Sequence, residues 1–446
     1  MIDTRVRDVI TAGEASVPAA LLRVVPRGYE PRTPTRPAAT VHRLQIIFKT
    51  VERCNLACPY CYYFNGGDQS YKERPARTSL EVLERLCEFL EEGVRDLHID
   101  TVDIVFHGGE PMLQRMSDFE ECCRRLRERI GPLCNLTFAI QTNGTKLDSK
   151  WADVLERYGV FLGVSLDGPA EIHDPGRPFH NGKGSLSRIV QGLEEIRLTH
   201  ADFYGRNVGV LTVLNAKNDY SQIARFFHQD LGIDIQSFLL PDCSYDDGIP
   251  EGRTAEEYGK ALCDIFDWWL TQPHTSVREV DKVLKRFQRA TLRAGTQMPA
   301  PAPAGDDSGR WIDNHVIVLQ SDGSMKVDDS YIPASDWREA APVAHIRDVS
   351  LKTYLEHEAF QELFDGLSTA PTACQGCSWV GICGGGDLEN RWSRDRRFDN
   401  PSIFCESLKM FYAHIVGYLV SNGYPQEYVD QRLSGTYDFI EHGYAS

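Results

Sequence analysis

The chain has 446 residues, 42% of them apolar, and a formal net charge of −16. At roughly 100–200 residues per domain, this length predicts two to four domains, or one large barrel with an appendage. The acidic balance argues against nucleic acid as a partner, because phosphate binding needs a basic face. No run of about 18 apolar residues occurs, so no membrane partner is expected, and the N-terminus lacks the apolar segment of a signal peptide.

Thirteen cysteines are the unusual feature of the composition. Without a secretion signal they indicate a reducing, cytoplasmic location, where clustered cysteines bind metal more often than they form disulfides. Seven fall into two groups, Cys54, Cys58 and Cys61, and then Cys374, Cys377, Cys383 and Cys405. The other six are scattered and are interpreted as structural: Cys87, Cys122, Cys123, Cys134, Cys243 and Cys263.

Residues 1–43 form a Pro/Arg-rich N-terminal extension with little to build a core. Its segment PRGYEPRTPTRP predicts extended or disordered chain. A solvated leader is favoured over a binding arm.

From residue 44 onward, short apolar segments alternate with helical patterns. The predicted strands cover residues 44–49, 102–107, 136–141, 160–166, 208–214 and 233–240. Between the first two, Thr78 and Glu81 predict a capping box ahead of the helix LEVLERLCEFLEEGV. Alternation of this kind indicates parallel strands joined by right-handed crossovers, hence an α/β fold over residues 44–240.

The rest of the chain, from residue 241 onward, shows a different pattern of predicted elements. Residues 241–309 are expected to be a helical connector, with helices near 254–271 and 276–294 and a Pro/Ala linker at 298–309. Residues 310–446 are expected to be a C-terminal domain. It opens with a hairpin at 315–329 that turns at Asp322-Gly323, followed by a helix near 350–365.

The first cysteine group, C-x3-C-x2-C, follows the first predicted strand, at the edge where parallel sheets bind ligands. Three thiolates can hold three irons of a [4Fe–4S] cube and leave the fourth iron open. Structural zinc normally takes four protein ligands, and no fourth His or Cys lies nearby in the sequence. The spacing therefore favours an iron–sulfur cluster over zinc.

The segment CNLACPYC resembles the cluster motif of the radical S-adenosylmethionine (SAM) enzymes, with Tyr60 at its aromatic position. GGEP (108–111), QTNG (141–144) and SLDGP (165–169) resemble further motifs of that family, each at the predicted end of a strand. The resemblance covers about residues 44–240 and implies a partial (β/α)6 barrel. It also implies that SAM is cleaved to a 5′-deoxyadenosyl radical, which abstracts a hydrogen atom.

The resemblance also implies which residues bind the cofactor: Tyr60, Gly108, Gly109, Glu110, Gln141, Asn143, Ser165, Asp167 and Arg177. Glu110 is expected to accept from the SAM ammonium, and Ser165 and Asp167 from ribose hydroxyls. Arg177 is expected to meet the SAM carboxylate. Each role has an alternative. Glu110 could be an ordinary surface glutamate in a loop, Ser165 and Asp167 could belong to a plain turn, and Arg177 could be solvated.

The second cysteine group resembles the SPASM extension of peptide-modifying radical SAM enzymes, which carries two auxiliary [4Fe–4S] clusters. Here Asp387 stands at one expected cysteine position and Asp328 at another. One auxiliary cluster is therefore expected to be lost. Four thiolates remain for a closed second [4Fe–4S] cluster, with zinc as the alternative: Cys374, Cys377, Cys383 and Cys405.

Three acids are the predicted catalytic residues, Asp328, Asp329 and Asp387. In the related sulfatase-maturing enzymes, an aspartate at the position of Asp329 is the general base. Carboxylates at close range raise one another's pKa, which suits a base. The alternative is that these acids are solvated on the hairpin.

The SPASM resemblance implies a peptide substrate and an external electron donor of the flavodoxin or ferredoxin type. ICGGGDLENRW resembles most the cyclophane-forming maturases, so we expect a radical SAM oxidoreductase that forms a carbon–carbon crosslink in a ribosomally made precursor peptide. The alternatives are a formylglycine-generating sulfatase maturase or a thioether-forming or epimerising enzyme. A non-catalytic iron–sulfur or zinc scaffold is the hypothesis of a different class.

Overall fold

The computed structural model describes residues 41–65, 70–272, 274–292, 314–332, 334 and 344–434. The predictions for residues 1–40 and for the linker at 298–309 lie outside these ranges. No helix within them is long and apolar enough to cross a membrane.

A single ten-stranded sheet organises the described residues, in the order β10-β9-β8-β1-β2-β3-β4-β5-β6-β7. The six predicted strands are confirmed as its centre, and each pairs with the next in parallel. They are β1 (Arg43–Val51), β2 (Thr101–Gly108), β3 (Asn135–Thr142), β4 (Val160–Ser165), β5 (Val208–Val213) and β6 (Ile235–Leu239). Their side chains are mostly buried, as a sheet covered on both faces requires.

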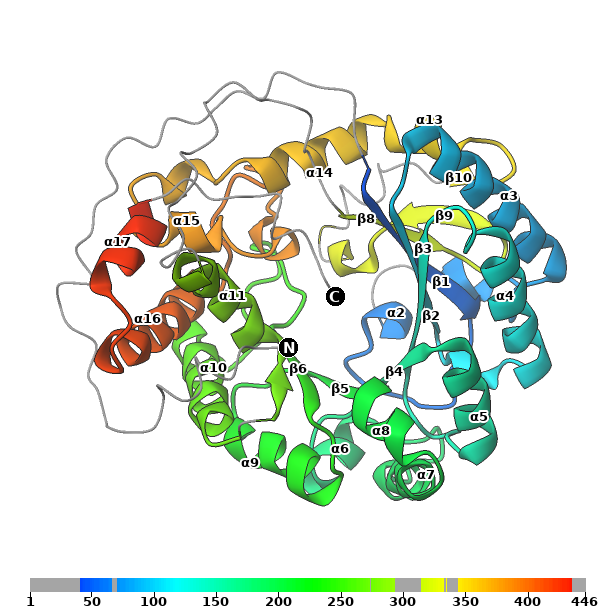
Figure 1. The fold of residues 1–446 in the computed structure, drawn as a ribbon, viewed down its shortest axis with the longest axis horizontal. Coiled ribbons are helices and arrows are strands. Elements are labelled where there is room, and N and C mark those ends of the chain that lie inside the picture. Colours follow the sequence, from blue (N-terminus) through cyan, green and yellow to red (C-terminus); the bar gives the residue numbers. More distant parts are fainter. Residues whose placement is uncertain are drawn as a thin grey trace.

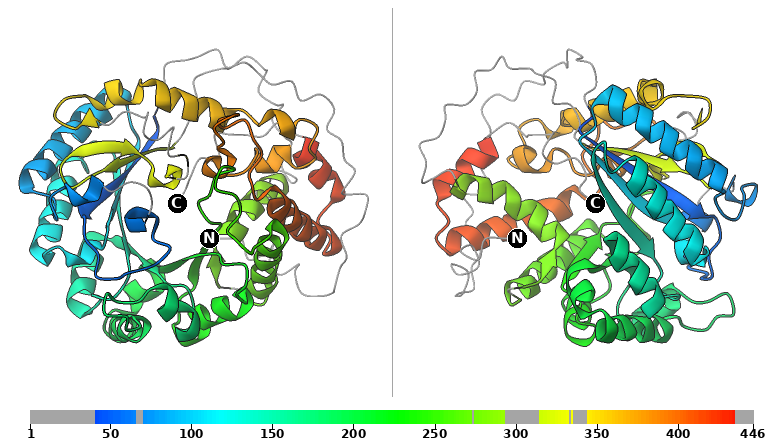
Figure 2. Two further views of the ribbon diagram at one scale, coloured as in Figure 1. Left: turned by 180° about the vertical axis from the view of Figure 1, so that it is seen from behind. Right: turned by 45° about the vertical axis from the view of Figure 1, so that its right-hand side comes forward.

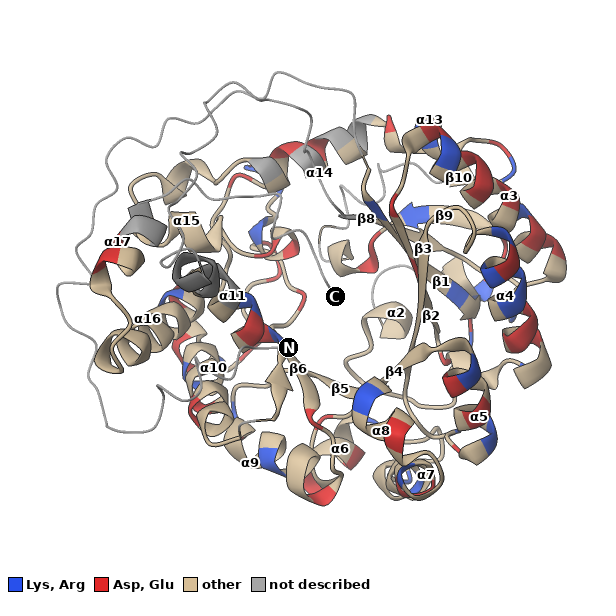
Figure 3. Cartoon of the chain, viewed as in Figure 1, with Lys and Arg blue, Asp and Glu red and all other residues tan. Residues whose placement is uncertain are grey.

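Helices between these strands cover the outer face of the curved sheet (Figure 1). They are α3 (Leu80–Leu97), α4 (Met116–Arg129), α5 (Ser149–Tyr158), α6 (Ala170–Gly176), α7 (Leu186–Thr199), α8 (Ala201–Asn207) and α9 (Tyr220–Arg225). Lys, Arg, Asp and Glu gather on the outward sides of α3, α4 and α5 (Figure 3). The apolar side of each helix thus faces the sheet and the charged side faces solvent.

The start of α3 differs from the prediction. Ser79, rather than Thr78, is the N-cap, and its hydroxyl accepts from the Val82 amide at 3.3 Å. Thr78 instead donates its backbone amide to the Thr50 carbonyl oxygen at 3.0 Å, which holds it against the end of β1. The predicted capping box of Thr78 and Glu81 is therefore wrong, because a tertiary hydrogen bond engages Thr78.

The predicted hairpin is confirmed as β8 (Asn314–Leu319) and β9 (Ser324–Val327), which pair antiparallel. β8 also pairs in parallel with β1, so the barrel sheet continues past the boundary expected at residue 310. The short strands β10 (Ala344–His345) and β7 (Ser276–Val277) lie at its two edges. The division into domains stays a prediction.

The C-terminal segment lies beside the open side of the sheet, opposite β1 to β3 (Figures 1 and 2). Its longest helix, α16 (Cys405–Ser421), packs against α10 (Ala255–Leu270), and a Cβ on Gly259 would lie 3.0 Å from the Ser407 backbone. The other α-helices of the second half are α11 (Arg278–Leu292), α13 (Leu351–Leu355), α14 (Glu358–Ser368), α15 (Val380–Cys383) and α17 (Gln426–Ser434). Two short 3-10 helices, η5 (Asp329–Tyr331) and η7 (Leu388–Arg391), also lie there.

Candidate functional site

The first cysteine motif occupies the loop that leaves the carboxyl end of β1. Its three cysteines are half-buried: Cys54, Cys58 and Cys61. The Leu56 amide donates to Sγ of Cys54 at 3.4 Å. The Ala57 amide donates to the Pro178 carbonyl oxygen at 2.8 Å, which ties the loop to the segment after α6.

Two glycines at the end of β2 let this loop approach the sheet. Gly108 has a φ of 139°, and a Cβ there would lie 2.1 Å from the Val51 carbonyl oxygen. A Cβ on Gly109 would lie 2.4 Å from the Arg53 carbonyl oxygen. The Gly109 amide itself donates to Val51 O at 2.7 Å. Both glycines thus serve the close approach of two backbone segments, and their contact with SAM stays a prediction.

Glu110 is wholly buried behind the cysteine loop. Its carboxylate accepts from the Met112 amide at 2.9 Å, from the Thr142 hydroxyl at 2.6 Å and from the Asn143 amide at 2.7 Å. Burial raises its pKa, and these hydrogen bonds oppose the rise. The side chain therefore links the ends of β2 and β3, a role that its sequence context did not reveal.

Asn143 connects β3 to the cysteine loop. Its side-chain amide lies 3.6 Å from Sγ of Cys54 and donates to Oδ1 of Asn55 at 3.0 Å. Gln141, two residues earlier on the strand, donates to the Ser165 hydroxyl at 2.7 Å, which joins the ends of β3 and β4. The predicted residues of three strands thus converge on one edge of the sheet.

Tyr60, Asp167 and Arg177 contact one another beside the loop. The Tyr60 hydroxyl donates to Asp167, and Nε of Arg177 donates to the other oxygen of that carboxylate at 3.0 Å. The Arg177 guanidinium lies 5.5 Å from the centre of the Tyr60 ring. The structure therefore brings these three predicted residues together, and their contacts with SAM stay predictions.

The donor set of the loop fits a cluster with one open iron. Burial raises the pKa of the Cys54 thiol to about 12 and that of Cys58 to about 11, so both are protonated at neutral pH without a metal. Positively charged iron would reverse this, because coordinated thiols are deprotonated. A [4Fe–4S] cube binds each thiolate through a different iron, and three soft sulfurs on one loop suit it.

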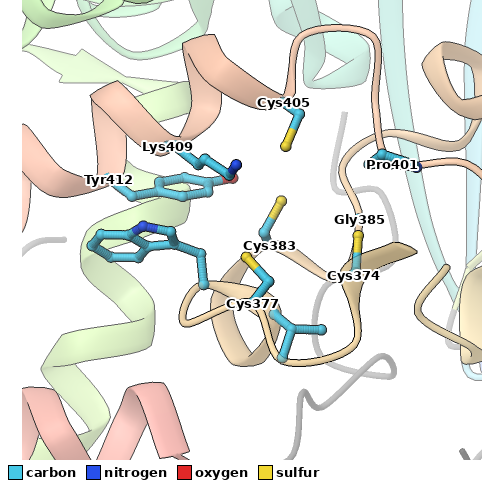
Figure 4. A pocket seen from close by; sticks show the side chains of 10 residues that line it. Cys374, Cys377, Cys383, Gly385, Pro401, Cys405, Lys409 and Tyr412 are labelled. Atoms are coloured by element: carbon cyan, nitrogen blue, oxygen red, sulfur yellow. The ribbon is translucent and has the colours of Figure 1, made fainter. Parts of the chain in front are cut away.

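The second cysteine group lines a pocket between α15 and the start of α16. Figure 4 shows the four sulfurs directed toward a common space. They belong to Cys374, Cys377, Cys383 and Cys405, and Trp379, Lys409 and Tyr412 complete one wall. Burial raises the pKa of Cys374 to about 12, with the neighbouring sulfurs adding to the rise. Four thiolates in a largely apolar pocket fit a closed [4Fe–4S] cluster.

Two of the three predicted catalytic acids, Asp328 and Asp329, lie together at the start of η5. Asp329 is 4% exposed and forms an ion pair with Lys49, which is fully buried at the end of β1. Burial and the Asp329 charge raise the pKa of Asp328, which caps η5 by accepting from the Ser330 amide at 3.1 Å. Asp387 is exposed, just before η7.

A fourth acid, Asp242, escaped the sequence analysis. Burial raises its pKa to about 7, and the charges of Asp328, Asp387 and Asp329 add to the rise. The residue follows the carboxyl end of β6, at the same edge of the sheet as the candidates that follow β1, β2, β3 and β4. Its position after the end of a predicted strand could have marked Asp242 as a candidate in the sequence, but no family motif includes it. Lys49 was missed because its side chain points inward from an apolar strand.

The comparisons with known proteins agree with this geometry. The family model of the radical SAM superfamily matches residues 48–219. A serine-type anaerobic sulfatase-maturating enzyme of Bacteroides thetaiotaomicron is 25% identical over 82% of this chain and 87% of its own length. The cysteine-type enzyme of Clostridium perfringens is 26% identical over 82% of this chain and 95% of its own.

Solved structures extend the comparison to the fold. Native anSMEcpe with bound AdoMet superimposes with a TM-score of 0.67, at 24% identity, over 85% of this chain and 98% of that one. Streptococcus suis SuiB bound to its precursor peptide SuiA gives 0.53 at 14% identity. The chain therefore has the α/β radical SAM fold with a parallel sheet, as the motifs implied.

The comparisons correct the functional prediction. The expected cyclophane-forming activity rested on the short segment ICGGGDLENRW. Several relatives that match about four-fifths of the chain are sulfatase-maturating enzymes instead. The findings thus favour the formylglycine-generating alternative of the sequence analysis, because similarity over about four-fifths of the chain outweighs eleven residues of a loop.

Proposed function

We propose that this protein is a radical SAM enzyme of the anaerobic sulfatase-maturase type, an oxidoreductase that converts a Ser or Cys side chain of a peptide to formylglycine. The observation that carries the proposal is the convergence of three strand-end motifs beside one three-cysteine loop, in a chain with sulfatase-maturase relatives over most of its length. The peptide-bound anSMEcpe structure supports a peptide substrate.

The first cluster would be held by Cys54, Cys58 and Cys61. When bound, the cluster and SAM supply the 5′-deoxyadenosyl radical, which accepts a hydrogen atom from the substrate. Asn143 would hold Cys54 through its amide. Tyr60, Asp167 and Arg177 would orient SAM at the edge of the sheet, where they already form one connected group.

The second cluster would be held by Cys374, Cys377, Cys383 and Cys405 in a SPASM-like segment. Four thiolates leave no iron open to the substrate, so this cluster would serve electron transfer or structure. Oxidation of the side chain by two electrons leaves one electron to be removed after hydrogen abstraction. An external donor of the flavodoxin or ferredoxin type, in a reducing cytoplasm, would start each cycle.

The test is anaerobic reconstitution followed by reaction with SAM, dithionite and two short peptides, one with a central Ser and one with a central Cys. We expect 5′-deoxyadenosine together with a peptide aldehyde that a hydrazide reagent traps. A matched Ala peptide should yield no aldehyde. Formation of 5′-deoxyadenosine without aldehyde from either peptide would refute the maturase function, whereas no 5′-deoxyadenosine at all would refute SAM cleavage.

A further inference from the structure

The start of helix α16 supplies one wall of the pocket formed by the second cysteine group. Cys405 is the first residue of the helix, and Lys409 and Tyr412 follow it by four and seven residues. Residues at these spacings lie one above another on the same face of a helix. All three line the pocket, and Figure 4 shows the nitrogen of Lys409 directed toward the space that the sulfurs share.

Lys409 supplies the positive charge of this wall. Among the residues that line the pocket, all of them in the described part of the chain, it is the one with a cationic side chain. Apart from the cysteines, the others are Trp379, Val380, Gly385, Pro401 and Tyr412. These residues carry no charge that could balance a negative group in the pocket, so the ammonium of Lys409 is the lining's source of positive charge.

A single carboxylate on the same helix holds this ammonium. Nζ of Lys409 donates to Oε1 of Glu406, three residues earlier on α16, at 2.9 Å. The Lys409 side chain is 40% exposed and that of Glu406 is 72% exposed. An ion pair this exposed contributes little to stability. Glu406 therefore orients the ammonium and offsets part of its charge, and the pair has little structural value of its own.

A second cation, Arg391, lies behind the pocket and is fixed by the fold. It is 3% exposed, and a Cβ on the pocket-lining Gly385 would lie 3.7 Å from its Cδ. Its guanidinium donates to the carbonyl oxygens of Phe398 at 3.0 Å and Gly366 at 2.8 Å. Because these bonds join separate segments, replacing Arg391 would disturb the fold, whereas Lys409 is partly exposed and can be replaced.

The positive charge matters because a cluster with four thiolates is negative before it is reduced. Such a site carries a charge of about −2 when oxidised and about −3 after one electron is added. A cation beside the sulfurs stabilises the more negative form more strongly, and the charges around a cluster set its reduction potential. The start of α16 acts in the same direction, because the N-terminal end of a helix is positive.

We propose that Lys409 raises the reduction potential of an iron–sulfur cluster held by the second cysteine group, an inference that rests on the auxiliary cluster of the proposed function. In that function, hydrogen abstraction leaves one electron to be removed from the peptide. The peptide is oxidised by one electron and the cluster is reduced by one. Lys409 acts through the cluster, which it makes a better acceptor for this electron.

The test is a redox titration of the second cluster by itself. In a parent chain of full length with Cys54, Cys58 and Cys61 replaced by Ala, about four irons per chain report the second cluster alone. Its reduced form is followed by electron paramagnetic resonance as the potential is changed. We expect Lys409→Met to lower the equilibrium constant for reduction about tenfold, a shift of about 59 mV toward lower potential. Lys409→Arg, which keeps the charge, should retain the parent potential.

Two further variants test the sign of the effect and its location. Glu406→Gln removes the carboxylate that offsets the ammonium, so the potential should rise. Arg85→Met is the matched control, since Arg85 is 38% exposed and pairs with Glu88 three residues later on α3. It removes the same charge from a helix on the outer face of the sheet (Figure 1) and should leave the potential unchanged.

The outcomes separate the inference from the proposed function. A lower potential in Lys409→Met and a higher one in Glu406→Gln support the inference, because a purely structural role would not produce shifts of opposite sign. Parent potentials in both variants, or an equal shift in Arg85→Met, would overturn it and leave the proposed function standing. If Lys409→Met binds no iron, the result with Glu406→Gln decides. If the parent chain itself binds no cluster, the auxiliary cluster of the proposed function fails and this inference fails with it.

Discussion

Lys49 and Asp329 form an ion pair inside the barrel, with side-chain exposures of 0% and 4%. The lysine lies near the carboxyl end of strand β1, before the cysteine loop, and the aspartate lies in η5, after the hairpin β8–β9. The pair therefore links the first strand of the sheet to a segment some 280 residues later in the chain. Each charge depends on the other, because neither reaches solvent.

Replacing the lysine should destabilise the protein strongly. Lys49→Met leaves the Asp329 carboxylate buried without its cation, which typically costs about 3–5 kcal/mol of unfolding free energy. The measurement is chemical denaturation of the purified chain. Arg157→Met is the control, since the Arg157–Glu120 pair is 58% and 33% exposed and should contribute less than about 1 kcal/mol. Equal small losses in both variants would contradict the pairing.

A methyl group at Gly109 should disrupt the first cluster site. The added Cβ would lie 2.4 Å from the Arg53 carbonyl oxygen, so the loop that carries Cys54 must move. We expect Gly109→Ala to bind about half the wild-type iron after reconstitution, because only the first of the two clusters is lost. Gly205→Ala is the control, because its Cβ has no neighbour within 4 Å in helix α8. It should keep full iron and gain about 0.5–1 kcal/mol of stability.

Loss of the Asn143 amide should weaken the hold on Cys54. The amide lies 3.6 Å from the sulfur and also supports Asn55. We expect Asn143→Ala to lose iron from the SAM-binding cluster several-fold faster than the wild type when a chelator is added. The measurement is the decay of the cluster's visible absorption. Asn422→Ala, at the far end of α16, should release iron at the wild-type rate. Identical release from both variants would mean that Asn143 has no part in holding the cluster.

Iron content should report the second cluster site directly. The wild type should hold about eight irons per chain, four for each cluster. Cys377→Ser removes one of four converging sulfurs and should lower the content to about four. Cys122→Ser, in the buried face of α4, should leave it unchanged. A wild type with about four irons per chain would rule out the auxiliary cluster.

Much of the fold follows from the sequence because local periodicity marks buried strands. All six central strands were predicted, since each is a short apolar run between helical patterns. The prediction at Thr78 failed because its partner, Thr50, lies 28 residues away and no local pattern reports such a contact. The continuation of the sheet into β8 was missed for the same reason.

The candidate site divides in a similar way. The cysteines were found from their spacing and the glycines from the family resemblance, whereas Asp242 and Lys49 carry no motif and gain their significance only from what surrounds them. Glu110 is the opposite case, a residue that was identified from its motif but whose contacts were not predicted. Its motif was recognised, but its three hydrogen bonds to the ends of β2 and β3 depend on tertiary structure.

The most direct test of the account follows the hydrogen atom. A Ser or Cys peptide carrying deuterium at Cβ of the reactive residue is incubated with reconstituted enzyme, SAM and dithionite, and 5′-deoxyadenosine is analysed by mass spectrometry. The account predicts that deuterium appears in 5′-deoxyadenosine in proportion to the aldehyde formed. Unlabelled 5′-deoxyadenosine formed at the same rate with and without peptide would contradict it.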